Sequence, residues 1–209
     1  MRNNPYVPFS SKILEVIPHT EKEYTFRMEF EGEVKPGQFF EVSIPKFGEA
    51  PISVSGISPK SIDLTIRRVG RVTDEVFENY AGDTLFLRGP YGNGFDVNKY
   101  TEGECLVVAG GTGVSPVRGV IDALSESKDA KDKHIILGFK SPLDMLFRED
   151  IARWEKSMDL ILTMDKEAKG YSGNVGLVTK FIPEVKLNNV ETTQAVVVGP
   201  PPMMKFSVI

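Results

Sequence analysis

The stretch AGGTGVSPVRG, residues 109–119, follows the apolar run 106–108 and leads into residues with helical spacing. Val117, Val120, Ile121 and Leu124 recur on one helix face, so the segment predicts a buried strand, a glycine loop and a helix. Ser115 is expected to be the N-cap of this helix, with Pro116 in its first turn. Free N–H groups at a helix start hold phosphates, so the loop predicts a nucleotide site; the alternative is a tight turn without a ligand.

Two common phosphate loops do not match this stretch. No G-x-x-x-x-G-K-[ST] occurs in the chain, which argues against ATP or GTP hydrolysis. The G-x-G-x-x-G pattern fails because Pro116 stands where its third glycine belongs. On its own, the loop indicates a nucleotide without saying which one.

The half of the chain around this loop has the pattern of an α/β domain. Apolar runs at 106–109, 135–139, 160–163 and 195–198 alternate with helical stretches, one of which carries Phe147, Ile151 and Trp154 on one face. Strands that alternate with helices predict a parallel sheet with right-handed crossovers, and ligands of such sheets bind at the carboxyl ends of the strands.

The first hundred residues have a different period. In YTFRMEF (24–30) and IDLTIR (62–67), apolar and polar residues alternate, as in strands with one buried face. Four more short runs, at 12–17, 37–44, 52–57 and 83–89, bring the expected strands to six, with turns that include residues 81–83. A short helix near 73–80 is expected to have Thr73 as its N-cap. These patterns predict an antiparallel barrel or sandwich over residues 1–98 and a parallel-sheet domain over 99–209.

Composition narrows the classes of function. The net charge of −4 argues against a nucleic-acid partner, and no apolar run reaches the ~20 residues needed to span a bilayer. Cys105 is the only cysteine and is expected to be a small buried residue, so the chain has neither an internal disulfide nor a cysteine-held metal site. With two histidines and no signal-peptide pattern, we expect no metal and a cytoplasmic location.

Several segments together resemble one family. The β-rich half, GPYGNGF (89–95), AGGTGVSP (109–116) and VVGPPPM (197–203) follow the order typical of the ferredoxin–NADP⁺ reductase superfamily. Within it, the chain resembles the anaerobic sulfite reductase B subunit, the sulfhydrogenase gamma subunit and the electron-transfer subunit of dihydroorotate dehydrogenase. The resemblance implies a six-stranded antiparallel Greek-key barrel that binds FAD, followed by a Rossmann-like parallel-sheet domain that binds NAD(P)H.

The resemblance assigns flavin contacts to two barrel segments. Ala50, Pro51, Ile52 and Ser53 match the family motif Arg-x-Tyr/Ile-Ser, with Ser53 expected near flavin N5 and with alanine in place of the motif's phosphate-binding arginine. Residues Arg67, Arg68, Val69, Gly70, Val72 and Thr73 match the second flavin motif, and the two arginines could replace the missing charge. The alternative for Arg67 and Arg68 is a solvated strand end.

The resemblance also assigns nucleotide contacts. Gly110, Gly111, Thr112, Gly113, Ser115 and Pro116 match the pyrophosphate loop of NAD(P)H, and Gly199, Pro200, Pro201 and Met203 match the segment beside the nicotinamide. Val198 stands at that segment's cysteine position, and residues 163–179 resemble the loop after the third strand. Lys140, Ser141 and Arg148 could contact a 2′-phosphate, whereas Asp144 could accept from a ribose hydroxyl, so the choice between NADH and NADPH stays open.

The function implied is that of a flavin-dependent oxidoreductase, one subunit of a larger complex. Hydride would pass from NAD(P)H to FAD beside Ser53, and single electrons would then pass to an iron–sulfur subunit or ferredoxin. Relatives continue with four cysteines that hold a [2Fe–2S] cluster, so we expect this chain to be truncated and to carry that cluster only if a further segment exists. The alternative is a non-catalytic regulatory or assembly subunit with weak flavin binding; a flavin-free dehydrogenase is disfavoured because no acid–base pair is evident.

Overall fold

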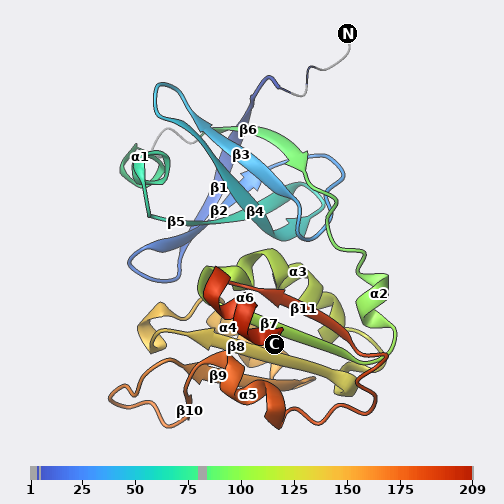
Figure 1. Cartoon of the computed structure of the whole chain (residues 1–209). Helices are drawn as coiled ribbons and strands as arrows, with labels where there is room; N and C mark the ends of the chain where they lie inside the picture. Colours follow the sequence, from blue (N-terminus) through green and yellow to red (C-terminus); the bar gives the residue numbers. More distant parts are fainter. Residues whose placement is uncertain (1–3, 5, 80–83, 209) are drawn as a thin grey trace. The chain divides into compact units, whose positions relative to one another are not determined.

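The computed structural model describes residue 4 and residues 6–79 and 84–208. The chain forms two compact units, Met1–Phe95 and Asp96–Ile209, shown from blue to red along the sequence in Figure 1. The turn predicted at 81–83 lies outside the described residues. Among the described residues, no helix is long and apolar enough to cross a membrane.

The first unit is a closed six-stranded barrel. Its strands are β1 (Phe9–Pro18), β2 (Glu23–Glu29), β3 (Phe39–Ile44), β4 (Gly48–Ser58), β5 (Ser61–Arg67) and β6 (Thr84–Tyr91). They follow the order β1-β2-β5-β4-β3-β6, and every neighbouring pair is antiparallel. This order confirms the predicted Greek-key barrel. Helix α1 (Arg71–Asn79) lies between β5 and β6 in the chain.

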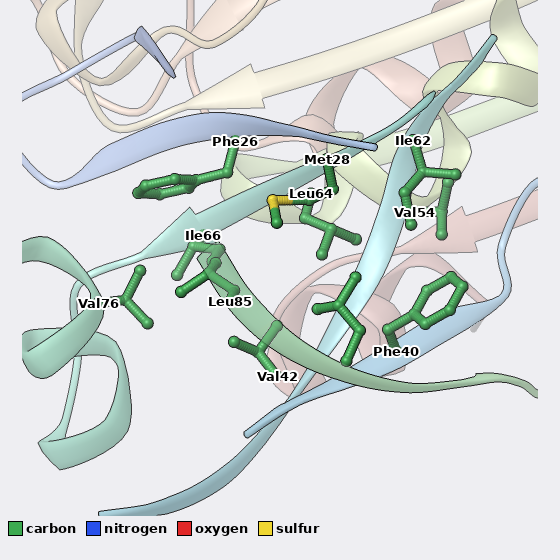
Figure 2. Close-up of a cluster of buried hydrophobic side chains, with 11 residues drawn as sticks. Phe26, Met28, Phe40, Val42, Val54, Ile62, Leu64, Ile66, Val76 and Leu85 are labelled. Atoms are coloured by element: carbon green, nitrogen blue, oxygen red, sulfur yellow. The ribbon is translucent and has the colours of Figure 1, made fainter. Parts of the chain in front are cut away.

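The barrel interior is filled by the apolar half of each alternating strand (Figure 2). Phe26, Met28, Leu64 and Ile66 from β2 and β5 are fully buried, and Val76 of α1 joins the same cluster. A buried side chain of this kind contributes about 1.5–3 kcal/mol relative to an exposed one. Burial of these alternating apolar residues is therefore the main source of barrel stability.

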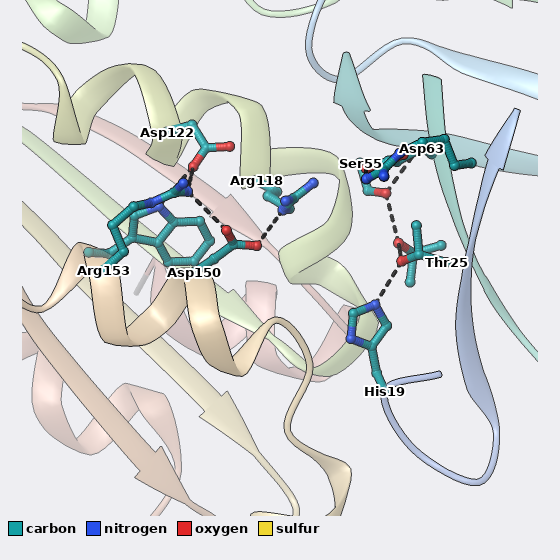
Figure 3. Close-up of polar contacts among 11 residues, drawn as sticks. His19, Thr25, Ser55, Asp63, Arg118, Asp122, Asp150 and Arg153 are labelled. Carbon is teal, nitrogen blue, oxygen red and sulfur yellow. Dashed lines mark hydrogen bonds and ion pairs between the residues drawn. The ribbon is translucent and has the colours of Figure 1, made fainter. Parts of the chain in front are cut away.

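A chain of hydroxyl groups links β2, β5 and β4 (Figure 3). Thr65 Oγ1 lies 2.7 Å from both Thr25 Oγ1 and Ser55 Oγ, and all three residues are buried. His19 Nε2 lies 2.7 Å from Thr25 Oγ1, and Ser55 also donates to the carbonyl of Asp63 at 3.1 Å. Because each hydroxyl has partners, polar side chains can be buried here at little cost.

The second unit is a five-stranded parallel sheet with helices. Its strands are β7 (Cys105–Gly110), β8 (Lys133–Phe139), β9 (Asp159–Met164), β10 (Asn174–Val175) and β11 (Gln194–Val198), in the order β10-β9-β8-β7-β11. Its helices are α2 (Asn98–Thr101), α3 (Val114–Ser125), α4 (Arg148–Trp154), α5 (Val178–Phe181) and α6 (Pro201–Ser207). The predicted α/β pattern is confirmed. The sequence prediction missed β10, which has only two residues and therefore no period to detect.

Polar contacts hold α3 and α4 together. Arg118 Nε lies 2.7 Å from Asp150 Oδ2, and Arg153 pairs with both Asp150 and Asp122 (Figure 3). The indole N–H of the fully buried Trp154 also donates to Asp122, at 2.9 Å. The α3–α4 pair thus has buried apolar residues on one side and a row of paired charges between the two helices.

A second set of polar contacts lies where the parallel strands begin. The Glu104 carboxylate accepts from Thr193 Oγ1 at 2.6 Å and from the backbone N–H groups of Asn188 and Asn189, and it lies 3.3 Å from His134 Nε2. Burial alone would raise the pKa of Glu104, but these hydrogen bonds lower it to about 2. The carboxylate therefore ties the segment before β11 to the beginning of β7.

Cys105 and Lys133 are adjacent in the β7–β8 register, and both are fully buried. Burial raises the pKa of the Cys105 thiol to about 11, against a smaller lowering by the Lys133 charge, so the thiol stays protonated and unreactive. The expectation that Cys105 is a small buried residue is confirmed. The Lys133 ammonium donates to the carbonyls of Thr101, at 3.0 Å, and Gly103.

Candidate functional site

The glycine loop lies at the carboxyl end of β7. The strand ends at Gly110, a 3₁₀ turn covers Gly111–Gly113, and α3 begins at Val114. Gly111 has a φ of +56°, which favours glycine. A Cβ on Gly113 would lie 2.7 Å from the carbonyl oxygen of Val198 and 2.8 Å from the Cα of Gly199. The loop therefore packs directly on the end of β11, and the two predicted nucleotide segments meet.

Two hydroxyls in this loop have no protein partner. Among the described residues, Thr112 Oγ1 and Ser115 Oγ are buried atoms without a hydrogen bond, and Ser115 as a whole is 2% exposed. A buried polar group left unsatisfied costs about 1–3 kcal/mol, so natural proteins keep few of them. Such groups are explained when a ligand completes their hydrogen bonds.

The prediction that Ser115 caps α3 is wrong. The N-cap is Gly113, which makes no side-chain capping bond, and Ser115 is the second residue of the helix. The 3₁₀ turn at Gly111–Gly113 moves the helix start toward the N-terminus, so the Ser115 hydroxyl is buried instead of capping the first turn. No side chain caps the start of α3, where the N–H of Val114 donates to the carbonyls of Gly111 and Thr112 in the 3₁₀ turn. The N–H groups of that turn, at the start of the continuous helical stretch, are the ones that face the position of an anion.

The side chain of Met203 lies so close to Gly110 and Gly199 that neither position has room for a Cβ. A Cβ on Gly110 would lie 2.6 Å from Met203 Sδ, and a Cβ on Gly199 would lie 2.6 Å from Met203 Cε. Met203 also packs against the cluster that includes Val108 and Ile136. The thioether thus fills the space above the ends of β7 and β11. Pro200 is the N-cap of α6 and Pro201 its first residue.

The residues after β8 form their own local contacts. Ser141 Oγ donates to Asp144 Oδ2 at 2.6 Å, and the Arg148 guanidinium donates to the carbonyl of Pro142. Lys140 follows the end of β8 directly and is exposed. The cations Lys140 and Arg148, which could bind a 2′-phosphate, and the carboxylate Asp144, which could accept from a ribose hydroxyl, all follow β8 in the chain. The choice between NADH and NADPH therefore stays open.

The first predicted flavin segment lies on β4. Its register pairs Ala50 with Val42, Ile52 with the buried Phe40, and Ser53 with Phe39. Ile52 packs against the barrel core, so the half-buried Ser53, the next residue, belongs to the opposite side of the strand. Pro51 is exposed and Ala50 half-buried.

The second predicted segment joins β5 to α1. Arg67 Nε lies 3.2 Å from Glu23 Oε1 without a well-aligned hydrogen bond, whereas Arg68 pairs with Asp74 and Glu78 of α1. Both guanidinium groups thus have carboxylates beside them. Val69 is 71% exposed, Gly70 is also exposed, and Val72 is half-buried.

Thr73 does not cap α1 as predicted. The helix begins at Arg71, and the Gly70 carbonyl accepts from the N–H of Asp74 at 2.7 Å. Thr73 is the third helical residue, and its hydroxyl accepts from the N–H groups of Val69 and Gly70 at 3.0 and 3.1 Å. These bonds hold the residues before α1 against the first turn of the helix. Because the Thr73 hydroxyl is used in this way, it does not cap the N–H groups of that first turn.

The sequence motifs did not identify Arg88, an arginine that lies beside the first predicted flavin segment. Arg88 of β6 pairs with Glu49, the neighbour of Ala50, and its Nη1 donates to Tyr91 Oη at 2.9 Å. The hydrogen bond from Arg88, supported by one from Ser43, lowers the pKa of Glu49. Finding this contact requires the register of β3 between β4 and β6, which no local motif contains.

The chain thus contains a barrel with one helix between its last two strands, followed in the sequence by a parallel sheet with a glycine loop after its first strand. The family model described as "Oxidoreductase NAD-binding domain" matches residues 107–208. The chain belongs to the ferredoxin–NADP⁺ reductase superfamily of FAD- and NAD-binding oxidoreductases.

Two curated relatives support the assignment of the chain to this family. The chain is 34% identical to the sulfhydrogenase 2 subunit gamma of Pyrococcus furiosus, over 97% of this chain and 78% of the relative. It is 31% identical to a probable dihydroorotate dehydrogenase B (NAD(+)) electron transfer subunit of Thermoplasma volcanium, over 95% and 70%. Both resemblances are confirmed. The resemblance to the sulfite reductase B subunit stays a prediction.

Solved structures give the same fold. A structure described as an NADH-dependent reduced ferredoxin-NADP oxidoreductase superimposes with a TM-score of 0.74 at 27% identity, covering 94% of this chain and 70% of that chain. A flavohemoglobin from Malassezia yamatoensis with bound FAD and heme gives a TM-score of 0.76 at 17% identity, covering 95% of this chain. The present chain spans 55% of that longer protein.

Proposed function

We propose that this chain is an FAD-containing electron-transfer subunit that oxidises NAD(P)H and delivers electrons to an iron–sulfur subunit or a ferredoxin. A bound flavin would supply the chemistry, by accepting two electrons from the nicotinamide and releasing them one at a time. The protein's task is to bind and orient both cofactors, which needs no acid–base pair.

The observation that carries the proposal is the pair of unpartnered hydroxyls on Thr112 and Ser115. They lie in a glycine loop, at the uncapped start of a twelve-residue helix, at the carboxyl end of a parallel strand. Helix N–H groups and hydroxyl donors suit the oxygens of a pyrophosphate, so the residues present fit a dinucleotide. We assign nucleotide binding to Gly110, Gly111, Thr112, Gly113, Ser115, Pro116, Lys140, Gly199, Pro200, Pro201 and Met203.

We assign the flavin to the barrel. Ser53 lies on the side of β4 away from the core and would donate a hydrogen bond to the flavin ring. The uncapped first turn of α1 would hold the phosphates. Arg67 and Arg68 would assist by donating to the phosphates as well as to their carboxylate partners Glu23 and Asp74. The full set is Ala50, Pro51, Ile52, Ser53, Arg67, Arg68, Val69, Gly70, Val72 and Thr73.

The relatives support the proposal that the chain has an electron partner. The curated proteins are a sulfhydrogenase subunit and an electron transfer subunit, so their printed names place them within larger complexes. A single-electron acceptor with an iron–sulfur centre is the partner chemistry that suits a flavin reduced by a two-electron donor.

The purified protein tests the proposal directly. We expect it to carry or take up FAD, to lose flavin absorbance under anaerobic conditions when NADH or NADPH is added, and to regain it when an oxidised ferredoxin is supplied. A protein that takes up no FAD contradicts the proposal. That result would favour the non-catalytic regulatory or assembly subunit, for which Ala50 and the carboxylate-paired Arg67 and Arg68 are the supporting observations.

A further inference from the structure

Strand β11 forms one edge of the parallel sheet (Figure 1). Among the described residues it pairs with β7 alone, so its other side faces no strand. The opposite edge strand, β10, is only two residues long, and short edge strands protect a sheet against pairing with another chain. β11 has five residues, QAVVV, with neither a charge nor a proline among them. Length, charge and proline therefore do not protect this edge.

The register of β11 shows which backbone groups face outward. The N–H of Gln194 donates to the carbonyl of Glu104, at 3.1 Å, just before β7. In a parallel ladder, every second residue of a strand directs both its N–H and its C=O toward the same neighbour. Every second residue from Gln194 onward therefore bonds to β7, and Ala195 and Val197 direct their backbone groups outward. Two donors and two acceptors thus lie along the edge, placed symmetrically about Val196.

This arrangement of donors and acceptors is complementary to itself. In an antiparallel hydrogen-bonded pair, two opposite residues exchange both of their N–H···O bonds. If two copies of β11 lie antiparallel with Val196 opposite Val196, Ala195 of each copy lies opposite Val197 of the other. The two pairs then make four hydrogen bonds, and every outward group of the strand has a partner. A shift by one residue would place each outward residue opposite one that bonds to β7.

The residues on either side of β11 complement each other across the same two-fold axis. Antiparallel pairing brings the start of one strand beside the end of the other. The exposed Glu191 lies three residues before the strand, and the exposed Lys205 of α6 lies seven residues after it. Beside them, Val190 is 75% exposed and Phe206 is 63% exposed. An acidic and an apolar residue at one end are thus matched by a basic and an apolar residue at the other.

We propose that β11 is a dimerisation edge, where two copies of this chain join their parallel sheets through an antiparallel β11–β11 pair. The occupant is a second copy because the outward backbone groups and the flanking charges are self-complementary. A standard interface carries about ten hydrogen bonds, so the four made here predict a reversible dimer with a Kd of about 10 μM. The inference goes beyond the proposed function and does not depend on cofactor binding.

Sedimentation velocity on the full chain, from about 1 to 200 μM, tests the proposal. We expect the wild-type mass to rise from one chain to two over this range. Ala195→Pro and Val197→Pro each remove one outward N–H, a position where edge strands tolerate proline, and should weaken the dimer at least tenfold. Ala195→Val keeps that N–H and is the matched control, with wild-type association expected. A wild-type protein that stays monomeric, or folded proline variants that associate normally, overturns the proposal.

A disulfide cross-link tests the register without removing any backbone group. In the proposed pair, Gln194 lies opposite Val198 of the other copy, at a non-hydrogen-bonded position where the Cα atoms are about 4.5 Å apart. That separation permits a disulfide. With oxidised glutathione, the double variant Gln194→Cys and Val198→Cys should form covalent dimers, whereas neither single variant should, because like positions lie at opposite ends of the pair. Cys105 is fully buried and common to all three proteins. A double variant that forms no more covalent dimer than the single variants refutes this pairing.

Discussion

Met203 Cε contacts the backbone of Gly199 so closely that a Cβ at position 199 would lie 2.6 Å from it. Gly199 is not at a positive φ, so backbone strain does not explain the glycine. The close contact means that two residues of one predicted cofactor segment depend on each other for packing, whether or not a nucleotide is bound.

The first prediction concerns this pair. Gly199→Ala displaces the flexible end of the methionine side chain, so it should lower the free energy of unfolding by less than the about 1–3 kcal/mol of overpacking in a rigid core. Met203→Ala leaves a space and, because this side chain is half-buried, should cost less than the about 2–5 kcal/mol of a fully buried methionine. In the double variant, the new methyl group enters that space, so the combined loss should be smaller than the sum of the two single losses. Urea unfolding of the four proteins measures this coupling, and strict additivity would refute it.

Lys133 gives a second prediction. Its buried ammonium donates to the carbonyls of Thr101 and Gly103, so Lys133→Met keeps most of the volume but leaves two acceptors without a donor. We expect the free energy of unfolding to fall by about 1–3 kcal/mol, measured by urea unfolding. Lys131→Met, at an exposed neighbouring position, is the matched control and should change stability by less than about 0.5 kcal/mol. Equal stability of the two variants would contradict this account.

Glu104 should make the fold sensitive to acid. Its pKa is lowered from 4.5 to about 2 in the folded chain, so the unfolded state binds the proton more readily. The stabilisation is complete above pH 4.5 and is lost as the pH falls toward 2. Glu104→Gln should therefore lower the urea midpoint at pH 7 and flatten its dependence on pH between 4.5 and 2. Glu167→Gln, at an exposed position, should retain the wild-type profile; if both variants do, the carboxylate contacts do not stabilise the fold.

The architecture was predictable because it depends on periods that the sequence contains. Alternation in residues 24–30 and 62–67 predicts strands, and the apolar run before the glycine loop predicts a strand buried on both faces. The expectation of one buried face is wrong for β5, where the polar Asp63 and Thr65 are buried as well because they have hydrogen-bond partners on neighbouring strands. Helix starts were less predictable. Both Ser115 and Thr73 were expected as N-caps, and in both cases the helix begins before the residue because a glycine takes the capping position.

The site was predictable only as far as its motifs are local. The meeting of the glycine loop with Gly199 follows from strand order, since β7 and β11 are neighbours although about ninety residues separate them. The partners of Arg67 and Arg68 and the approach of Arg88 to Glu49 depend on strand register and helix position. No motif encodes these relationships, because any single segment contains only one side of each contact.

The last prediction uses the two unpartnered hydroxyls, because folding and binding should respond to their removal in opposite directions. In the free protein, Thr112 Oγ1 and Ser115 Oγ are buried without hydrogen bonds. Thr112→Val and Ser115→Ala remove that cost while keeping nearly the same shape, so each should raise the free energy of unfolding by up to about 1 kcal/mol. The same substitutions remove donors for a pyrophosphate, so each should raise the dissociation constant for NADH or NADPH about tenfold, with the flavin affinity unchanged.

The matched control is Ser125→Ala at the other end of α3, where the hydroxyl donates to the carbonyl of Asp122 at 2.7 Å. Its loss should lower stability slightly and leave nucleotide binding unchanged. Calorimetric titration and urea unfolding measure the two effects separately. If Thr112→Val and Ser115→Ala lower both stability and affinity, the hydroxyls have partners within the fold and do not serve a ligand. If stability rises and affinity is unchanged, the loop binds its nucleotide through backbone N–H groups alone.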